Sequence, residues 1–241
     1  MCSLNMRKRK LRFFIRAFLL CFFSLVGIFF LLFFSVRYLA NSDYFKIKES
    51  EYFFGENIFR VNLQKEAQGL SKRYPYYKRI ILRRRMPDRI VIDSQPRKAI
   101  ARVKLSEYFY VDREGVLFYP AVQEDANLQL PLIVGLDEEI PDPRSGMKYI
   151  EKSFLTTLDF IDSLNKDSNL TEQLKIKEIN LTNVNDVFLF ANTGCKINLG
   201  GILSLHKDLS ILQNLISEIK SDFSKIEYVD LRFREPVVKY K

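Results

Sequence analysis

The stretch "AFLLCFFSLVGIFFLLFFSV", residues 17–36, contains twenty residues and no charged side chain. Fifteen of the twenty are Leu, Ile, Val or Phe, and inserting them into a bilayer is favourable by roughly 4 to 9 kcal/mol. A helix of this length covers about 30 Å, the thickness of a membrane's hydrocarbon core. Arg16 and Arg37 flank the stretch. The sequence therefore predicts one transmembrane helix over residues 17–36.

The charges on either side of this helix predict its orientation. Residues 1–16 carry six basic side chains and no acidic one, and basic flanks stay on the cytoplasmic side. We expect this tail in the cytoplasm and the chain from Arg37 onward outside it. A cleaved signal peptide is the alternative, but the apolar run is long for a signal sequence and no small-x-small cleavage site follows it.

A second basic segment, "RIILRRRMPDRIVI" at residues 79–92, contains five arginines. Such clusters bind nucleic-acid phosphates, but the expected topology separates this one from DNA and cytoplasmic RNA. Alternation along a strand places Arg79, Arg83 and Arg85 on one face. This pattern favours a strand that faces solvent or lipid headgroups over a specific anion site.

Residues 43–103 are expected to form a small α+β domain. The segment 44–52 favours a strand, and Asn62 is suited to cap a helix that Pro75 ends. Residues 79–92 alternate as two strands of a hairpin. The order strand, helix, strand, strand predicts a small sheet with helical cover.

Residues 104–241 are expected to form a second, β-rich domain with two helices. Strands and tight turns are predicted in "YFYVDREGVLFYP", "LPLIVG" and "VFLFANTGCKINL", where Gly194 is available for positive φ. Apolar residues recur at helical spacing over 148–164 and 205–219. The whole chain is therefore assigned to the α+β class.

The chain is poor in groups that carry out catalysis or hold a metal. Its one histidine is His206, and its three cysteines are dispersed at Cys2, Cys21 and Cys195. "GCKINLGG" lacks the spacing of a phosphate-binding loop. We therefore expect a binding protein with no catalytic residue, cofactor or metal.

The last predicted strand is the most suggestive binding surface. In "IEYVDLRFREPVVKYK" the side chains of Val229, Leu231 and Phe233 share one face, and little chain remains to cover the strand's edge. An uncovered edge invites pairing with a partner's strand. Pro236 lacks an N–H and suits an edge, where its alternative role is protection against aggregation.

Six segments stand out, in order, along the chain beyond the membrane helix. They are "RYPYYKRIILRRRMPDRIVI" at 73–92, "AIAR" at 99–102, "YVDREGVLF" at 110–118, "LPLIVG" at 130–135, "CKINLG" at 195–200 and "YVDLRF" at 228–233. Each is a weak signal alone. Together, in this order over most of the chain, they strongly resemble the FtsQ/DivIB family of bacterial cell-division proteins.

The resemblance implies a POTRA domain over 43–103 and an FtsQ-type β-domain over 104–241. It also implies a non-catalytic scaffold at the division septum of the inner membrane, which holds the bitopic proteins FtsB and FtsL and links them to the septal synthase pair FtsW and FtsI. In the family, FtsB is thought to add a strand to the last strand of the β-domain. The partner-binding residues carried over are Arg232, Phe233, Arg234, Glu235, Pro236, Val237 and Val238.

Two features depart from the family pattern. The interval before "GENIFRVNL" is too short for an additional POTRA helix, and Glu235 and Pro236 stand where the family has small residues. The alternative function is a POTRA-containing component of envelope transport or secretion. That alternative predicts tandem POTRA units or a barrel, which the sequence does not show.

Overall fold

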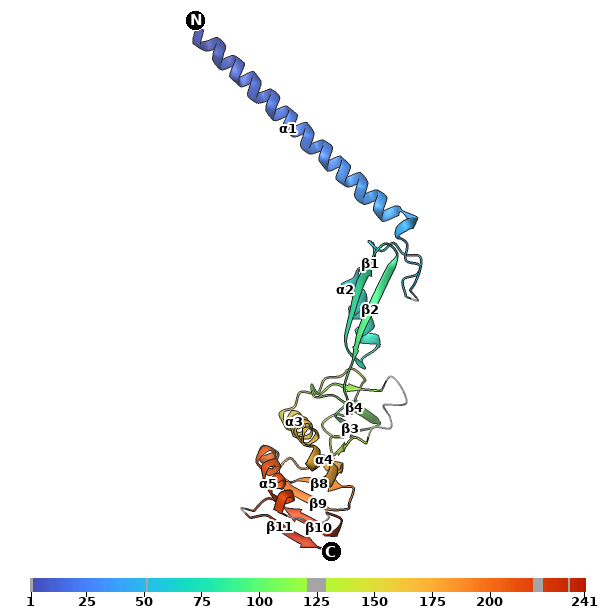
Figure 1. The fold of residues 1–241 in the computed structure, drawn as a ribbon, viewed down its shortest axis with the longest axis vertical. Coiled ribbons are helices and arrows are strands. Elements are labelled where there is room, and N and C mark those ends of the chain that lie inside the picture. The colour runs from blue at the N-terminus through green and yellow to red at the C-terminus, as the bar shows by residue number, and fades with distance from the viewer. Residues whose placement is uncertain (1, 51, 121–128, 219–222, 234) are drawn as a thin grey trace. The chain divides into compact units, whose positions relative to one another are not determined.

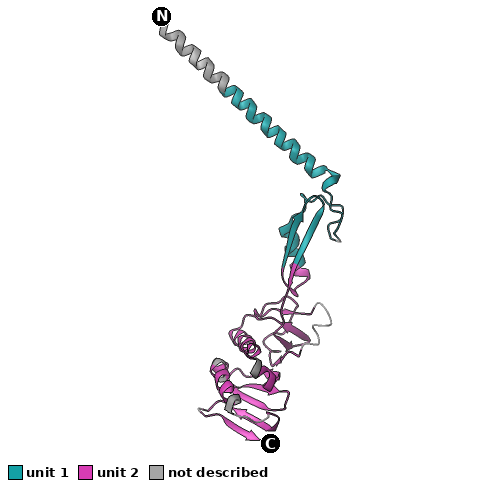
Figure 2. Ribbon diagram, viewed as in Figure 1, with its two compact units in different colours: residues 1–70, 80–93 teal, residues 71–79, 94–241 magenta. Residues whose placement is uncertain are grey.

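The computed structural model describes residues 2–50, 52–120, 129–218, 223–233 and 235–241 (Figure 1). The side chains of the basic tail, with all others in residues 1–17, lie outside this description. The chain divides into two compact units, which are residues 1–70 with 80–93 and residues 71–79 with 94–241 (Figure 2).

The N-terminal helix α1 extends over Cys2–Asn41. Its segment Phe18–Asn41 has a mean hydropathy of 2.7 and is long and apolar enough to cross a membrane. No part of that window is buried among the described residues, as expected of a helix whose side chains face lipid. The predicted span, residues 17–36, overlaps this segment, and the chain fits a single-pass membrane protein.

The sheet of the first unit is the predicted hairpin. Strands β1 and β2 form a two-stranded sheet, and Ile80 and Leu82 are buried on one face. Asn62 Oδ1 accepts the N–H of Lys65 (3.1 Å) and so caps α2 as predicted. The elements are η1 (Asp43–Phe45), α2 (Leu63–Arg73), β1 (Tyr77–Arg85) and β2 (Arg89–Pro96).

The strand expected over 44–52 is not a regular strand. Its first residues form the short helix η1, because Ser42 accepts the N–H of Tyr44 and starts a tight turn after α1. Among its other described residues, the pairing is limited to isolated bridges, Lys46 with Asn57 and Glu49 with Arg89. The abrupt turn out of the membrane helix therefore leaves too little extended chain for a continuous ladder.

Most cations of the hairpin have partners in the structure. Arg84, on the same face as Ile80 and Leu82, donates to the carbonyls of Ile58 and Val61 (both 2.8 Å). Arg83 pairs with Asp93, and Arg89 pairs with Glu49. These cations therefore stabilise the first unit itself.

The second unit is built on a nine-stranded mixed sheet with the order β11-β10-β9-β8-β7-β6-β3-β4-β5. β6 is parallel to β3 and β7, β9 is parallel to β10, and the other pairs are antiparallel. The strands are β3 (Ala101–Lys104), β4 (Tyr108–Val111), β5 (Leu117–Phe118), β6 (Leu132–Val134), β7 (Ile176–Asn180), β8 (Val187–Ala191), β9 (Lys196–Gly200), β10 (Ile226–Asp230) and β11 (Val237–Tyr240). The strands predicted in "YFYVDREGVLFYP", "LPLIVG" and "VFLFANTGCKINL" are all confirmed.

Helices contribute side chains to one apolar core with the sheet. Phe154, Leu158 and Ile161 of α3 are buried in it, as the helical spacing predicts, whereas Ile150 lies before the helix and is exposed. The short helix α4 has no predicted counterpart. The helical elements are α3 (Lys152–Lys166), α4 (Ser168–Leu174), η3 (Ile202–Ser204), α5 (Leu205–Glu218) and η4 (Phe223–Lys225).

Two glycines with positive φ allow a test of how tightly this unit is packed. Gly135 (φ +92°) follows β6, and a Cβ there would overlap the backbone of Thr182. Gly194 (φ +85°), in the β8–β9 turn, has its nearest atom 4.0 Å from such a Cβ.

We predict that Gly194→Ala lowers the free energy of unfolding by about 1 to 2 kcal/mol, from φ alone. Gly135→Ala should cost at least about 1 kcal/mol more because of the overlap. Urea unfolding of the full chain in detergent micelles measures both. Equal losses in the two variants would contradict the close approach at Gly135.

Candidate functional site

The last strand of the sheet is β11, and this changes the expected binding edge. The sequence predicted that the strand containing Val229 runs on through residue 238 with a bare edge. Instead β10 ends at Asp230, and the chain turns back so that β11 pairs antiparallel with it. The prediction of a bare edge on β10 is therefore wrong, because a later segment of the same chain covers that edge.

The turn begins where the pairing of β10 with β9 gives way to a local hydrogen bond. Leu231 N–H still donates across the sheet to Asn198 O of β9 (2.9 Å), whereas Arg232 N–H donates to the Asp230 carboxylate (3.1 Å). The second bond turns the backbone in place of a ladder bond. Pro236, without an N–H, precedes β11, which is where a proline is tolerated.

The outer side of β11 is the open edge of the sheet. Lys241 N–H donates inward to Lys225 O (2.9 Å). Neighbouring residues of an antiparallel strand point their backbone groups to opposite sides. The N–H and C=O groups of Val238 and Tyr240 therefore point away from β10, and no strand among the described residues lies beyond them.

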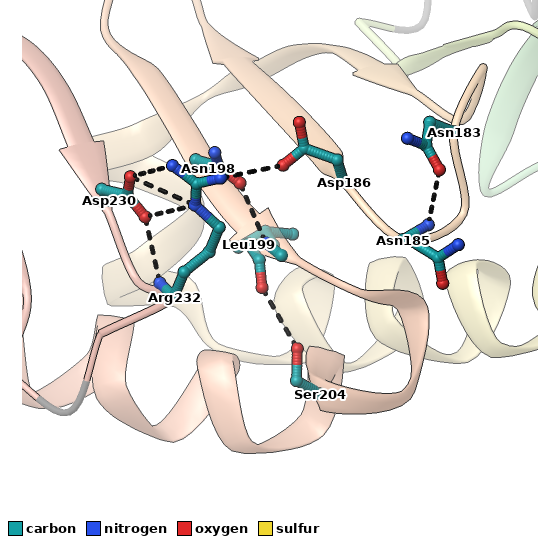
Figure 3. A network of polar contacts seen from close by, with 9 residues as sticks. Asn183, Asn185, Asp186, Asn198, Leu199, Ser204, Asp230 and Arg232 are labelled. Carbon is teal, nitrogen blue, oxygen red and sulfur yellow. Dashed lines mark hydrogen bonds and ion pairs between the residues drawn. The ribbon is translucent and has the colours of Figure 1, made fainter.

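A carboxylate–guanidinium pair supports the turn (Figure 3). Arg232 Nε and Nη2 donate to the two oxygens of Asp230 (3.0 and 2.8 Å), and Nη1 lies 3.7 Å from Asp186 Oδ1. Asp230 is buried, whereas about half of the Arg232 side chain is exposed. Hydrogen bonding from Arg232 holds the pKa of Asp230 below its usual value, against the opposing effect of burial.

The predicted site residues divide between this turn and the edge strand. Phe233 is 57% exposed rather than buried, because the chain has left the strand before it. Its ring centroid lies 6.0 Å from the Arg232 guanidinium carbon. Arg232, Phe233, Glu235 and Pro236 belong to the turn, and Val237 and Val238 begin β11; Arg234 lies outside the described residues.

The sheet face beside the edge holds residues that sequence reasoning did not select. Phe188 and Lys196 lie side by side, with the Lys196 ammonium 3.8 Å from the ring centroid, and Lys239 pairs with Glu227 (2.8 Å). A cavity of about 260 Å³ is lined by Phe188, Lys196, Asn198, Glu227, Tyr228, Val229 and Asp230. The sequence did contain a signal for this surface. Alternation in "VFLF" and "CKINL" places Phe188 and Lys196 on one face of β8 and β9.

Comparison with known proteins assigns the chain to a family. The family model "Cell division protein FtsQ/DivIB, C-terminal" matches residues 99–232, more than half of the 241 residues. The chain belongs to the FtsQ/DivIB family. The match covers most of the nine-stranded sheet and ends two residues after β10, so β11 lies beyond it.

Individual relatives carry names of the same kind. The chain is 26% identical to "Cell division protein FtsQ" of Geotalea daltonii and 27% identical to that of Geobacter sp. (strain M21), in each case over 76% of this chain and 65% of the relative. It is 25% identical to "Cell division protein DivIB" of Clostridium acetobutylicum, over 75% of this chain and 70% of the relative. The matched part thus spans about two-thirds of the length of these relatives.

The Asp230–Arg232 pair predicts a pH dependence of stability. The pKa of Asp230 is lower in the folded than in the unfolded chain, so its ionised carboxylate stabilises the fold at pH values above the unfolded pKa of about 3.9. This stabilisation is lost as the pH falls through the pKa of the folded state. We predict that Asp230→Asn costs about 1 kcal/mol at pH 7, and that the difference from wild type shrinks below about pH 4.

Thermal unfolding of the full chain in micelles between pH 3 and pH 7 measures this difference. Asp142→Asn, at an ion pair with Arg144 in which both side chains are exposed, is the matched control and should stay within about 0.5 kcal/mol of wild type at every pH. A difference for Asp230→Asn that does not change with pH would contradict the assignment.

Proposed function

We propose that this chain is a non-catalytic, single-pass scaffold of the division machinery that binds a partner's strand at the outer edge of β11. Its membership in a family named for cell division supports the process. The open edge supports the binding mode. The family resemblance supports an FtsB-like bitopic protein as the partner that supplies the strand.

The observation that carries the proposal is a difference between the two ends of the sheet. At the β5 end, the segment 146–149 covers the outer side of the strand. Leu117 N–H donates to Met147 O (2.8 Å), and Gly146 N–H donates to Leu117 O (2.7 Å). No described residue does this for β11. One edge is therefore closed within the chain, and the other is available for strand addition.

The proposed binding residues follow from this geometry. Val238 and Tyr240 offer their outward backbone groups to the added strand. Phe233, exposed in the adjoining turn, supplies apolar area, and burying it would contribute about 1.5 to 3 kcal/mol. Arg232 positions the turn through Asp230, so a charge reversal there would place like charges against Asp230 and Asp186 and disturb the fold as well as binding.

The remaining parts of the proposal follow from the family resemblance and from charge. The basic tail lies in the cytoplasm, and both folded units lie outside it. A POTRA domain over 43–103 precedes the β-domain over 104–241. FtsL-like proteins and the septal synthase pair FtsW and FtsI are the further partners, reached through the FtsB-like protein. The family name favours this function over the transport alternative.

We predict that Tyr240→Pro weakens capture of the FtsB-like partner of the same organism by about tenfold or more. Proline removes the outward N–H and places its ring where the added strand would pair, with little effect on β10. Tyr240→Ala keeps the N–H and should stay within about threefold of wild type, since it changes only an exposed side chain.

Binding of the two full-length proteins in nanodiscs, with circular dichroism as a folding control, measures both variants. Equal weakening by proline and alanine would show that the side chain, and not the backbone edge, makes the contact. Unchanged capture by Tyr240→Pro would exclude strand addition at β11.

We predict that the full chain fused to a fluorescent protein at its N-terminus collects at the septum of dividing cells. Tyr240→Pro should reduce the septal signal where recruitment of the partner depends on the edge, while the total amount of fusion in the membrane stays the same. Imaging and membrane fractionation measure the two quantities. Uniform peripheral signal from the wild-type fusion would favour the transport alternative.

A further inference from the structure

We propose that the first unit contacts the membrane surface through a second site, which binds a phospholipid headgroup beside the end of α1. The site consists of an aromatic cluster, Tyr44, Phe45 and Phe59, together with Tyr38 in the last turn of α1 and a polar pocket next to them. We call this the juxtamembrane site. It is separate from the edge of β11 and does not depend on the partner proposed there.

Hydrogen bonds hold the site against the membrane helix. Asn57 Nδ2 donates to Leu39 O (3.1 Å) and Ser42 O (3.4 Å). The first bond satisfies a carbonyl in the last turn of α1, which lacks a partner within the helix, and the second adds to the bond that Ser42 O accepts from Phe45 N–H (3.3 Å). Phe59 follows the end of α1 by eighteen residues, but its ring packs against that of Phe45, which follows the helix by only four.

The aromatic cluster has the composition of a membrane interface. The ring centroids of Tyr44 and Phe45 are 5.0 Å apart, and those of Phe45 and Phe59 are 5.1 Å apart. Tyr44 and Phe59 nevertheless remain 64% and 40% exposed, and Tyr38 on α1 is 73% exposed. Exposed aromatic side chains at the end of a membrane span are suited to the headgroup layer, where one side is apolar and the other is hydrated.

The polar pocket offers both signs of charge. It has a volume of about 260 Å³ and is lined by Ala40, Asn41, Lys46, Gly55, Glu56, Asn57 and Arg60. The Arg60 guanidinium donates to Asn41 Oδ1, and neither Arg60 nor Glu56 forms an ion pair with another described residue. Lys46 pairs with Asp43 (2.7 Å).

The opposite charges of Arg60 and Glu56 in this pocket identify the class of ligand. A guanidinium binds phosphate through two parallel hydrogen bonds, so Arg60 would hold the lipid phosphate. Glu56 would accept hydrogen bonds from a primary amine. Lys46 and Arg60 balance Asp43 and Glu56 in charge, so net attraction to anionic lipid is not expected. An ethanolamine headgroup supplies both groups that the pocket requires.

The depth of the site is measurable because the chain contains no tryptophan. We predict that Phe59→Trp in full-length protein, in nanodiscs of phosphatidylcholine and phosphatidylethanolamine, is quenched by lipids brominated near the headgroup. Tyr108→Trp, at an exposed position on β4, is the control and should be quenched at least about twofold less. Equal quenching of the two would overturn the placement at the membrane surface.

Headgroup binding is tested separately by native mass spectrometry of the full chain released from the same nanodiscs. Wild type should retain phosphatidylethanolamine, and Arg60→Gln and Glu56→Gln should each lose at least about half of it. Lys48→Gln is the matched control, since Lys48 pairs with Asp88 and does not line the pocket. Equal retention by all variants, or equal retention of phosphatidylcholine, would overturn the assigned ligand, and retention of free phosphate alone would exclude a lipid.

Discussion

The backbone N–H and C=O groups on each side of a strand need partners, which are another strand, a covering segment or water, and this requirement organises the second unit. Seven strands of the sheet have a strand on each side. At one end, the short strand β5 is covered by the segment around Met147, which is part of the same chain. At the other end, β11 has only one neighbour. The nine-stranded sheet therefore leaves its open backbone groups at the β11 edge, and this is the basis of the proposed strand addition.

The position of that edge depends on one turn. β10 is held in the sheet by parallel pairing with β9, and Asp230 and Arg232 then direct the chain back on itself. A buried carboxylate is stable here because a guanidinium satisfies both of its oxygens. Without this pair the chain after β10 would have no local reason to reverse. β11, and with it the open edge, thus depends on two side chains outside the edge itself.

Periodicity in the sequence was sufficient for most of the fold, and local side-chain chemistry explains the rest. The membrane helix was predicted from an uninterrupted apolar run, and the hairpin over residues 79–92 and the pair β8 and β9 were predicted because apolar residues alternate along them. The reversal after Asp230 was missed because "VDLRF" alternates as one continuous strand, and its end is set by a side-chain hydrogen bond. The bent start of the first unit was missed for a similar reason, since Ser42 acts through a local side-chain hydrogen bond to Tyr44 and Asn57 acts through tertiary contacts.

The binding free energy available at so short an edge explains why the proposed partner binding also needs the membrane helix. The outward groups of Val238 and Tyr240 provide at most four hydrogen bonds, worth about 2 to 6 kcal/mol in all, and Phe233 adds about 1.5 to 3 kcal/mol. Association in solution costs about 4 to 15 kcal/mol, so these contacts alone give weak binding. The proposed partner, anchored in the same bilayer, would meet the edge at an effective concentration near the millimolar range, which favours binding by about 4 kcal/mol over a dissolved partner at about micromolar concentration. The proposed binding at β11 therefore depends on α1, which would keep the chain and its partner in one membrane.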